Sequence, residues 1–158
     1  MKKLLIRRLL AGMIDYGLAM IYALILLTIF SAIYNIWNIN PASVHPMVLQ
    51  IAGFSTITIP IFLYFFMSEN YPNHATIGKR FLKIKVSPGN IFLRNVLKLL
   101  PWEVGHRGVQ WMIYYDDSQL GYPYWVWVLL ITSLLVMLVY WVSIIRTEGK
   151  SSLYDHWA

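Results

Sequence analysis

Carboxylates inside apolar stretches are the residues of this sequence best suited to chemistry. Asp15 lies in a long apolar stretch near the N-terminus, and Glu103 with His106 forms a Glu-x-x-His pair in a shorter one. The i, i+3 spacing places the carboxylate and the imidazole on one face of a helix, and an imidazole ordinarily titrates at about pH 6.5. Acids inside apolar helices usually face a partner, a cavity or an ion path. The pattern predicts ion or proton binding by Asp15, with Glu103 and His106 as a proton relay.

Each of these positions also has a purely structural interpretation. Asp15 could hydrogen-bond a neighbouring helix and do nothing else. Glu103 and His106 could belong to the polar face of a helix lying flat in a membrane interface, and Arg107, four residues after Glu103, could neutralise its charge. A mixed cation site requires that Asp15 meets Glu103 and His106 in space. The sequence leaves these interpretations open.

Templates for other chemistry are missing. The chain has no cysteine, which excludes disulfides, thiolate nucleophiles and thiolate metal sites. It has no second Glu-x-x-His pair for a di-metal centre, and no Gly-x-Ser-x-Gly, P-loop, Gly-x-Gly-x-x-Gly or His-Glu-x-x-His sequence. We therefore expect no enzyme activity, no catalytic residue, no cofactor and no resident metal. The net charge of +6 comes without a helix-turn-helix, zinc or RNP pattern, so nucleic acid is not an expected partner.

Composition places the chain in a lipid bilayer. Its 158 residues are 58% hydrophobic and 13% charged, with a mean hydropathy of +0.56, whereas soluble domains carry about 25% charged residues. A crossing helix needs about 20 apolar residues, and the stretches 9–34, 47–67 and 122–145 meet that length. The first is too long for the apolar core of a signal peptide, so we expect it to be retained. The chain is predicted to be one all-α membrane domain, residues 1–158.

The distribution of Lys and Arg predicts the orientation. Basic residues cluster before the first span and in the loop 68–98, whereas 35–46 contains none. Cytoplasmic loops carry the excess of such residues, and Arg146 and Lys150 place the C-terminus on the cytoplasmic side too. An even number of crossings follows, and 99–115 is the candidate fourth span. This segment either crosses with its polar side inward or lies in the interface. We expect a bundle of three to four helices with both ends cytoplasmic, and we favour the crossing.

The first span also carries a face suited to close helix contact. Every fourth position is small or is Asp15, in the series Ala11, Asp15, Ala19 and Ala23. Such spacing lets membrane helices approach one another. Arg8 precedes Asp15 by seven residues, which puts both on nearly the same side but about 10 Å apart along the axis. We expect both side chains to converge on groups from other segments.

Pro60 interrupts the second span, shortly after Ser55, Thr56 and Thr58. A proline inside a helix removes one hydrogen bond and frees a carbonyl oxygen. Within a membrane such a carbonyl needs another donor. The sequence therefore predicts a kink with freed carbonyls in this span.

Three short motifs occur in an order typical of one known family. They run from Arg8 to Asp15 (RLLAGMID), from Ala75 to Val86 (ATIGKRFLKIKV) and from Leu153 to His156 (LYDH), with Arg94 between the second and the third. In that order they resemble the RDD family of bacterial membrane proteins, named for one arginine and two aspartates. Two positions differ, because Ile77 replaces the loop proline of the family and Tyr154 replaces a histidine.

The resemblance implies a small multi-pass protein of the bacterial plasma membrane, in a family mostly of unassigned activity. Some relatives are linked to monovalent cation/proton antiport, and others are similar to accessory or regulatory membrane proteins. We therefore expect exchange of monovalent cations and protons by a homo-oligomer. Arg8, Arg94 and Asp155 would form a charge network, and Gly78 and Lys79 belong to the loop motif. The alternative is a protein that transports nothing and binds another membrane protein or peptide.

Overall fold

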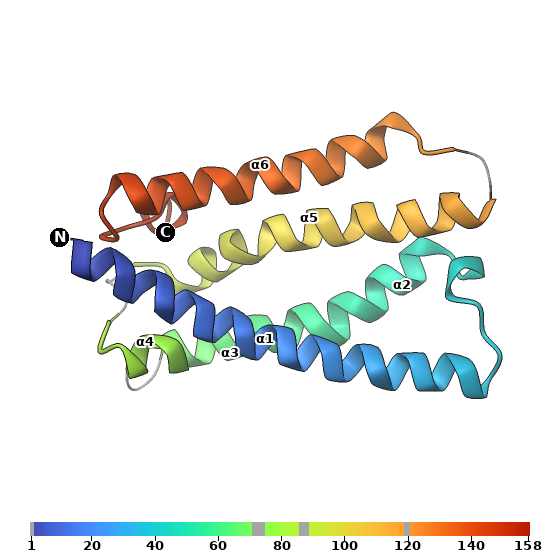
Figure 1. The fold of residues 1–158 in the computed structure, drawn as a ribbon, viewed down its shortest axis with the longest axis horizontal. Helices are drawn as coiled ribbons and strands as arrows, with labels where there is room; N and C mark the ends of the chain where they lie inside the picture. The colour runs from blue at the N-terminus through green and yellow to red at the C-terminus, as the bar shows by residue number, and fades with distance from the viewer. Residues whose placement is uncertain (1, 71–74, 86–88, 119–120) are drawn as a thin grey trace.

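The fold is a bundle of long helices in up-and-down order (Figure 1). The computed structural model describes residues 2–70, 75–85, 89–118 and 121–158, and each regular element within them is helical. The long elements are α1 (Lys2–Ile36), α2 (Pro46–Gly53) with its continuations η2 (Phe54–Thr58) and α3 (Ile59–Asn70), α5 (Ile91–Ser118) and α6 (Tyr124–Arg146). The short ones are η1 (Pro41–Ser43), α4 (Ile77–Phe81) and α7 (Leu153–His156).

Three helical segments have the length and hydropathy of membrane spans, namely Lys3–Ile36, Pro46–Asn70 and Tyr124–Arg146. They contain or overlap the predicted spans 9–34, 47–67 and 122–145. Their outer surfaces are apolar: on α1, Met13 and Met20 are each 66% exposed and Leu27 is 65% exposed. A surface of this kind is stable in lipid, which solvates it. The prediction of an all-α membrane protein is confirmed.

α5 is the remaining long helix, and it contains the predicted segment 99–115. It lies alongside α6 (Figure 1), where glycines bring the two backbones close together. A Cβ atom on Gly105 would lie 2.6 Å from Ser133 Oγ, and one on Gly108 would lie 2.8 Å from Leu130 Cδ2. A side chain at either position would force Ser133 or Leu130 to shift, so α5 and α6 form a tightly packed pair.

The loop predicted at 68–98 is shorter in the structure. α3 continues to Asn70, α4 occupies Ile77–Phe81, and α5 already begins at Ile91. Asn90 starts α5, because its side-chain oxygen accepts a hydrogen bond from the Leu93 N–H at 3.0 Å and so caps the free N–H groups of the first turn. The first turns of α5 carry Arg94 and Lys98, and these charges hid the helix from an analysis based on apolar stretches.

Both termini, α4 and the start of α5 lie at one end of the bundle (Figure 1). We call this the basic end, because it gathers Lys and Arg from four segments: Arg7 and Arg8 in α1, Lys79 and Arg80 in α4, Arg94 and Lys98 in α5, and Arg146 and Lys150 around the end of α6. At the opposite end, the segments 37–46 and 121–123 contain no Lys or Arg. The bundle is therefore strongly polarised in charge.

Two prolines interrupt the long helices, and each freed carbonyl is satisfied by a tyrosine of another helix. Pro60 cannot donate to the carbonyl oxygen of Thr56, which accepts instead from the Tyr22 hydroxyl at 2.7 Å. The π-helical turn η2 ends at Thr58, two residues before Pro60. Pro101 likewise cannot donate to Leu97, whose oxygen accepts from the Tyr140 hydroxyl at 3.1 Å. The freed carbonyl predicted before Pro60 is confirmed.

Candidate functional site

Asp15 holds α4 against α1. The residue is buried, with 3% of its surface exposed. Its Oδ1 accepts hydrogen bonds from the Tyr64 hydroxyl and the Gly78 N–H, both at 2.9 Å, and its Oδ2 accepts one from the Thr76 hydroxyl. The N–H groups of a first helical turn lack partners within the helix, so the carboxylate supplies an acceptor to the start of α4. Donors from α3, from α4 and from Thr76, the residue before α4, occupy both of its oxygens.

Gly78 permits this contact because it has no side chain. A Cβ atom at this position would lie 2.2 Å from the carbonyl oxygen of Ala11 and 3.1 Å from Asp15 Cγ. Ala11 itself is 1% exposed. The close contact predicted for the small-residue face of the first span is therefore confirmed at Ala11. The partner of Ala11 is Gly78, which belongs to the motif from Ala75 to Val86.

Asp155 joins the C-terminal segment to α1 and α5. Its Oδ2 forms an ion pair with Arg8 and accepts the Ser152 N–H at 2.9 Å, and its Oδ1 lies 3.1 Å from Arg94 Nε. Burial by itself raises the pKa of Asp155, but Arg8, the Ser152 N–H and Arg94 outweigh it and hold the pKa below the ordinary 3.8. Arg8 also donates to the carbonyl oxygen of Gly149 at 3.1 Å. The structure therefore brings Arg8, Arg94 and Asp155 together.

A second buried carboxylate, which the sequence analysis missed, joins α3, α4 and α5. Glu69 is fully buried, and its Oε1 lies 2.6 Å from Lys79 Nζ and 3.1 Å from Lys98 Nζ. Its Oε2 accepts from Asn95 Nδ2 at 3.2 Å. One signal was available: Glu69 is the only acidic residue between Asp15 and Glu103, and it stands at the end of a span, before a run of bases.

Glu103 lies away from these charges, about 18 Å along α5 from Ile91 at 1.5 Å per residue. Its Oε2 accepts from Gln50 Nε2 at 2.8 Å, and its Oε1 accepts from the Thr58 hydroxyl, on the last residue of η2. Both donors are neutral. No ion pair to Glu103 occurs among the described residues, so this carboxylate faces α2 and η2 without a counter-charge.

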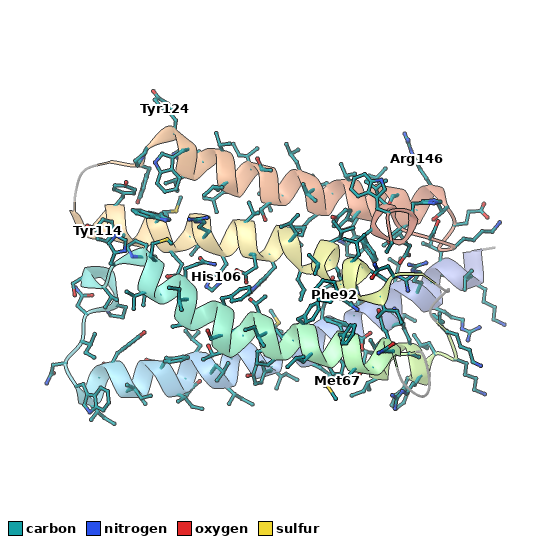
Figure 2. All side chains as sticks on the ribbon, turned by 180° about the vertical axis from the view of Figure 1, so that it is seen from behind. Met67, Phe92, His106, Tyr114, Tyr124 and Arg146 are labelled. Carbon is teal, nitrogen blue, oxygen red and sulfur yellow. The ribbon has the colours of Figure 1, made fainter. Side chains whose placement is uncertain are left out.

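His106 lies one turn further along α5, between α5 and α2 (Figure 2). Its ring packs so closely on α2 that a Cβ atom on Gly53 would lie 2.5 Å from His106 Cε1. Its Nε2 lies 2.9 Å from Gln110 Nε2. We call Gln50, Thr58, Glu103, His106 and Gln110 the Glu103 cluster.

The Glu103 cluster contains buried polar atoms without a hydrogen-bond partner, namely Gln50 Oε1, His106 Nδ1 and Gln110 Oε1. An unpaired buried polar atom costs about 1–3 kcal/mol, so such atoms are rare and often belong to functional sites or bind an ion or water. Two of the three are amide oxygens, which act only as acceptors. Gln50 Oε1 belongs to the amide whose Nε2 donates to Glu103, so one acceptor without a partner lies next to this carboxylate.

Comparison with known proteins identifies the family. The family model of the RDD family matches residues 3–158, essentially the whole chain. The chain belongs to the RDD family. No curated protein and no solved structure matches the chain significantly. Family membership and the apolar helices together establish an integral membrane protein.

The residues that carry the RDD resemblance meet at the basic end. Arg8 pairs with Asp155, and Asp15 lies on the start of α4, where Gly78 approaches it. Glu103 and His106 belong to a separate cluster, and no hydrogen bond joins the two side chains directly. Among the described residues, no group of three or more His, Asp or Glu side chains is placed to hold a metal ion. The mixed cation site of Asp15, Glu103 and His106 is therefore not assembled.

Proposed function

We propose that this RDD-family protein crosses the bacterial plasma membrane four times, with both termini in the cytoplasm. The basic end supports this orientation, because cytoplasmic segments carry the excess of Lys and Arg. The position of α5 beside α6 supports the fourth crossing. A topology probe placed after residue 118 tests the proposal. Labelling from outside the cell is expected, and labelling from the cytoplasm would place α5 in the interface.

We further propose that the protein exchanges monovalent cations for protons at the Glu103 cluster. The carrying observation is that Glu103 is bonded to the neutral donors Gln50 and Thr58, among buried oxygen atoms without partners. A carboxylate without a counter-charge inside a membrane binds a proton or a cation, because an isolated charge there is unfavourable. His106 would relay the proton, as one turn of helix separates it from Glu103.

Asp15, the ion-binding residue expected from the sequence, remains a candidate, but an ion there would displace hydrogen bonds that already exist. Its oxygens already accept hydrogen bonds from Tyr64, Thr76 and Gly78. A proton or cation there would compete with these donors and release the start of α4. Ion binding at Asp15 would therefore be coupled to movement of α4, whereas ion binding at Glu103 requires no such movement.

The test is ion-driven proton flux in liposomes containing the purified protein, with Na⁺, Li⁺ and K⁺ at several pH values. Glu103→Gln is expected to abolish flux without lowering the amount of folded protein. Asp116→Asn is the matched control, because Asp116 is an exposed acid on the same helix, and it should retain flux. Loss of flux in Asp15→Asn alone would transfer the ion site to Asp15. Flux that survives both Glu103→Gln and Asp15→Asn would refute an essential role for either acid.

A second function, that of an accessory protein without transport activity, has a specific observation in its favour. The charges at the basic end are used internally, since Arg8 and Arg94 pair with Asp155 and Lys79 and Lys98 pair with Glu69. Charges that pair with one another in this way can hold the bundle together without taking part in transport. This function predicts no flux from folded protein and a stable complex with another membrane protein in detergent. Exchange predicts flux, and we expect it from a homo-oligomer, which crosslinking in native membranes would detect.

A further inference from the structure

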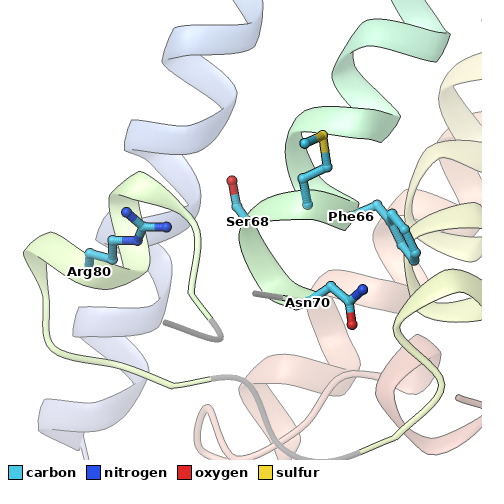
Figure 3. A pocket seen from close by; sticks show the side chains of 5 residues that line it. Phe66, Ser68, Asn70 and Arg80 are labelled. Atoms are coloured by element: carbon cyan, nitrogen blue, oxygen red, sulfur yellow. The ribbon is translucent and has the colours of Figure 1, made fainter. Parts of the chain in front are cut away.

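An open pocket of about 430 Å³ lies at the basic end, between the last turn of α3 and α4 (Figure 3). Its lining has an apolar part, Phe66 and Met67, and a polar part, Ser68, Asn70 and Arg80. No acidic side chain lines it among the described residues. The pocket is separate from the Glu103 cluster, which lies between α5 and the helix formed by α2 and η2.

The polar side chains of this pocket have donor groups without a partner among the described residues. Arg80 donates through Nε to the carbonyl oxygen of Ala75 at 2.9 Å, and within the described residues its two terminal nitrogens make no hydrogen bond or ion pair. The same holds for the Ser68 hydroxyl and the Asn70 amide. Arg8 and Arg94 differ from Arg80, since both pair with Asp155. The pocket thus presents an exposed guanidinium, an amide and a hydroxyl, which are hydrogen-bond donors suited to an anion.

The position of the pocket is fixed by the structure around it. Asp15 holds the start of α4, and Arg7 holds its end by donating to the carbonyl oxygens of Leu82 and Lys83. Met67 in the pocket lining is 65% exposed, and Phe81, which follows Arg80 in the sequence, is 77% exposed. Exposed apolar side chains next to an uncommitted arginine are typical of the boundary between hydrocarbon and lipid headgroups.

We propose that this pocket binds the phosphate group of an anionic phospholipid, with Arg80 as its charged ligand. A planar guanidinium binds two phosphate oxygens at once, and Ser68 and Asn70 supply further donors. Met67, which is 65% exposed, would lie beside the glycerol and the first part of an acyl chain. The assignment of this lipid to the cytoplasmic leaflet rests on the proposed topology, whereas its binding does not depend on ion exchange at Glu103.

The experiment is native mass spectrometry of the full chain, released from detergent supplemented with phosphatidylglycerol or with phosphatidylcholine. We expect phosphatidylglycerol to be retained preferentially, and Arg80→Gln to weaken its binding about tenfold or more, the effect of losing one charge-assisted bond. Arg146→Gln is the matched control, because Arg146 is an exposed arginine at the same end (Figure 2), and it should bind like the parent chain.

A second variant keeps Arg80 intact. Asn70→Asp places a carboxylate in the pocket and should weaken phosphatidylglycerol binding as strongly as Arg80→Gln, while thermal unfolding shows that both variants are folded. Equal losses in Arg80→Gln and Arg146→Gln would overturn the proposal in favour of general attraction to the basic end. Competition by inorganic phosphate at millimolar concentration would also overturn it, because the pocket would then be a site for a free anion.

Discussion

The contact between α4 and α1 makes a sharp prediction for Gly78→Ala. On an ordinary helix, replacing glycine by alanine stabilises the protein by up to about 1 kcal/mol. At Gly78 the new Cβ atom would lie 2.2 Å from the carbonyl oxygen of Ala11, a backbone atom that cannot rotate away. α4 must therefore move from α1 by about 1 Å to restore a normal contact.

That movement sets the magnitude of the effect. The hydrogen bond from the Gly78 N–H to Asp15 is 2.9 Å long, and a shift of about 1 Å takes it beyond bonding range. A hydrogen bond to a charged acceptor contributes about 1.5–3 kcal/mol, and overpacking costs about 1–3 kcal/mol. After subtraction of the gain in helix propensity, we expect Gly78→Ala to lower the free energy of unfolding by about 3 kcal/mol.

The assay is reversible unfolding in mixed detergent, followed by circular dichroism, with hydrogen exchange of residues 76–82 as a local readout. Gly17→Ala is the matched control, since nothing lies within 4 Å of the Cβ atom it adds. We expect Gly17→Ala to leave the protein as stable or slightly more stable, and Gly78→Ala to destabilise it and speed exchange in α4. A stabilised Gly78→Ala variant with unchanged exchange would refute the packing of α4 on α1.

Three further effects are expected. Tyr22→Phe and Tyr140→Phe should each lower the free energy of unfolding by about 1 kcal/mol, because each leaves a proline-freed carbonyl without a donor, whereas Tyr124→Phe, at a residue 91% exposed, should not change it. Glu69→Gln should cost about 3 kcal/mol in the same assay, since it leaves two partly buried lysines without their carboxylate. The lowered pKa of Asp155 adds stability that is present at neutral pH and is lost as the pH falls below 3.8. A pH series of thermal unfolding should show a larger loss in the parent chain than in Asp155→Asn, which keeps only the loss from Glu69 and the other acids.

The fold was largely predictable because lipid imposes simple rules on sequence. Long apolar stretches marked the cores of α1, α2 to α3, and α6, and the positions of Lys and Arg predicted one basic end. The start of α5 was not predictable in this way. Asn90 begins that helix, and its first turns carry Arg94 and Lys98. Because these charges lower the mean hydropathy, a search for apolar stretches assigns the turns to a loop, although carboxylates from other segments pair with both charges.

The contacts of the candidate residues were only partly predictable. Spacing along a helix indicated correctly that Arg8 and Asp15 do not pair directly but meet groups from other segments. It could not identify those groups, because Asp155 and Gly78 are distant in sequence and each meets its partner through a turn. Glu69 was missed for the same reason: its importance depends on Lys79 and Lys98, which arrive from two other helices.

The residues that carry the RDD resemblance and the residues proposed to exchange ions lie in different parts of the bundle. Arg8, Asp15, Gly78 and Asp155 all serve to hold α1, α4 and the C-terminal segment together at the basic end. The Glu103 cluster lies outside every motif that carries the resemblance. The motifs therefore predict a shared way of closing one end of the bundle rather than a shared substrate. If exchange occurs at Glu103, substitutions at the basic end should reduce the amount of folded protein. Substitutions of Gln50 or Thr58, which bond Glu103, should change which ion is carried.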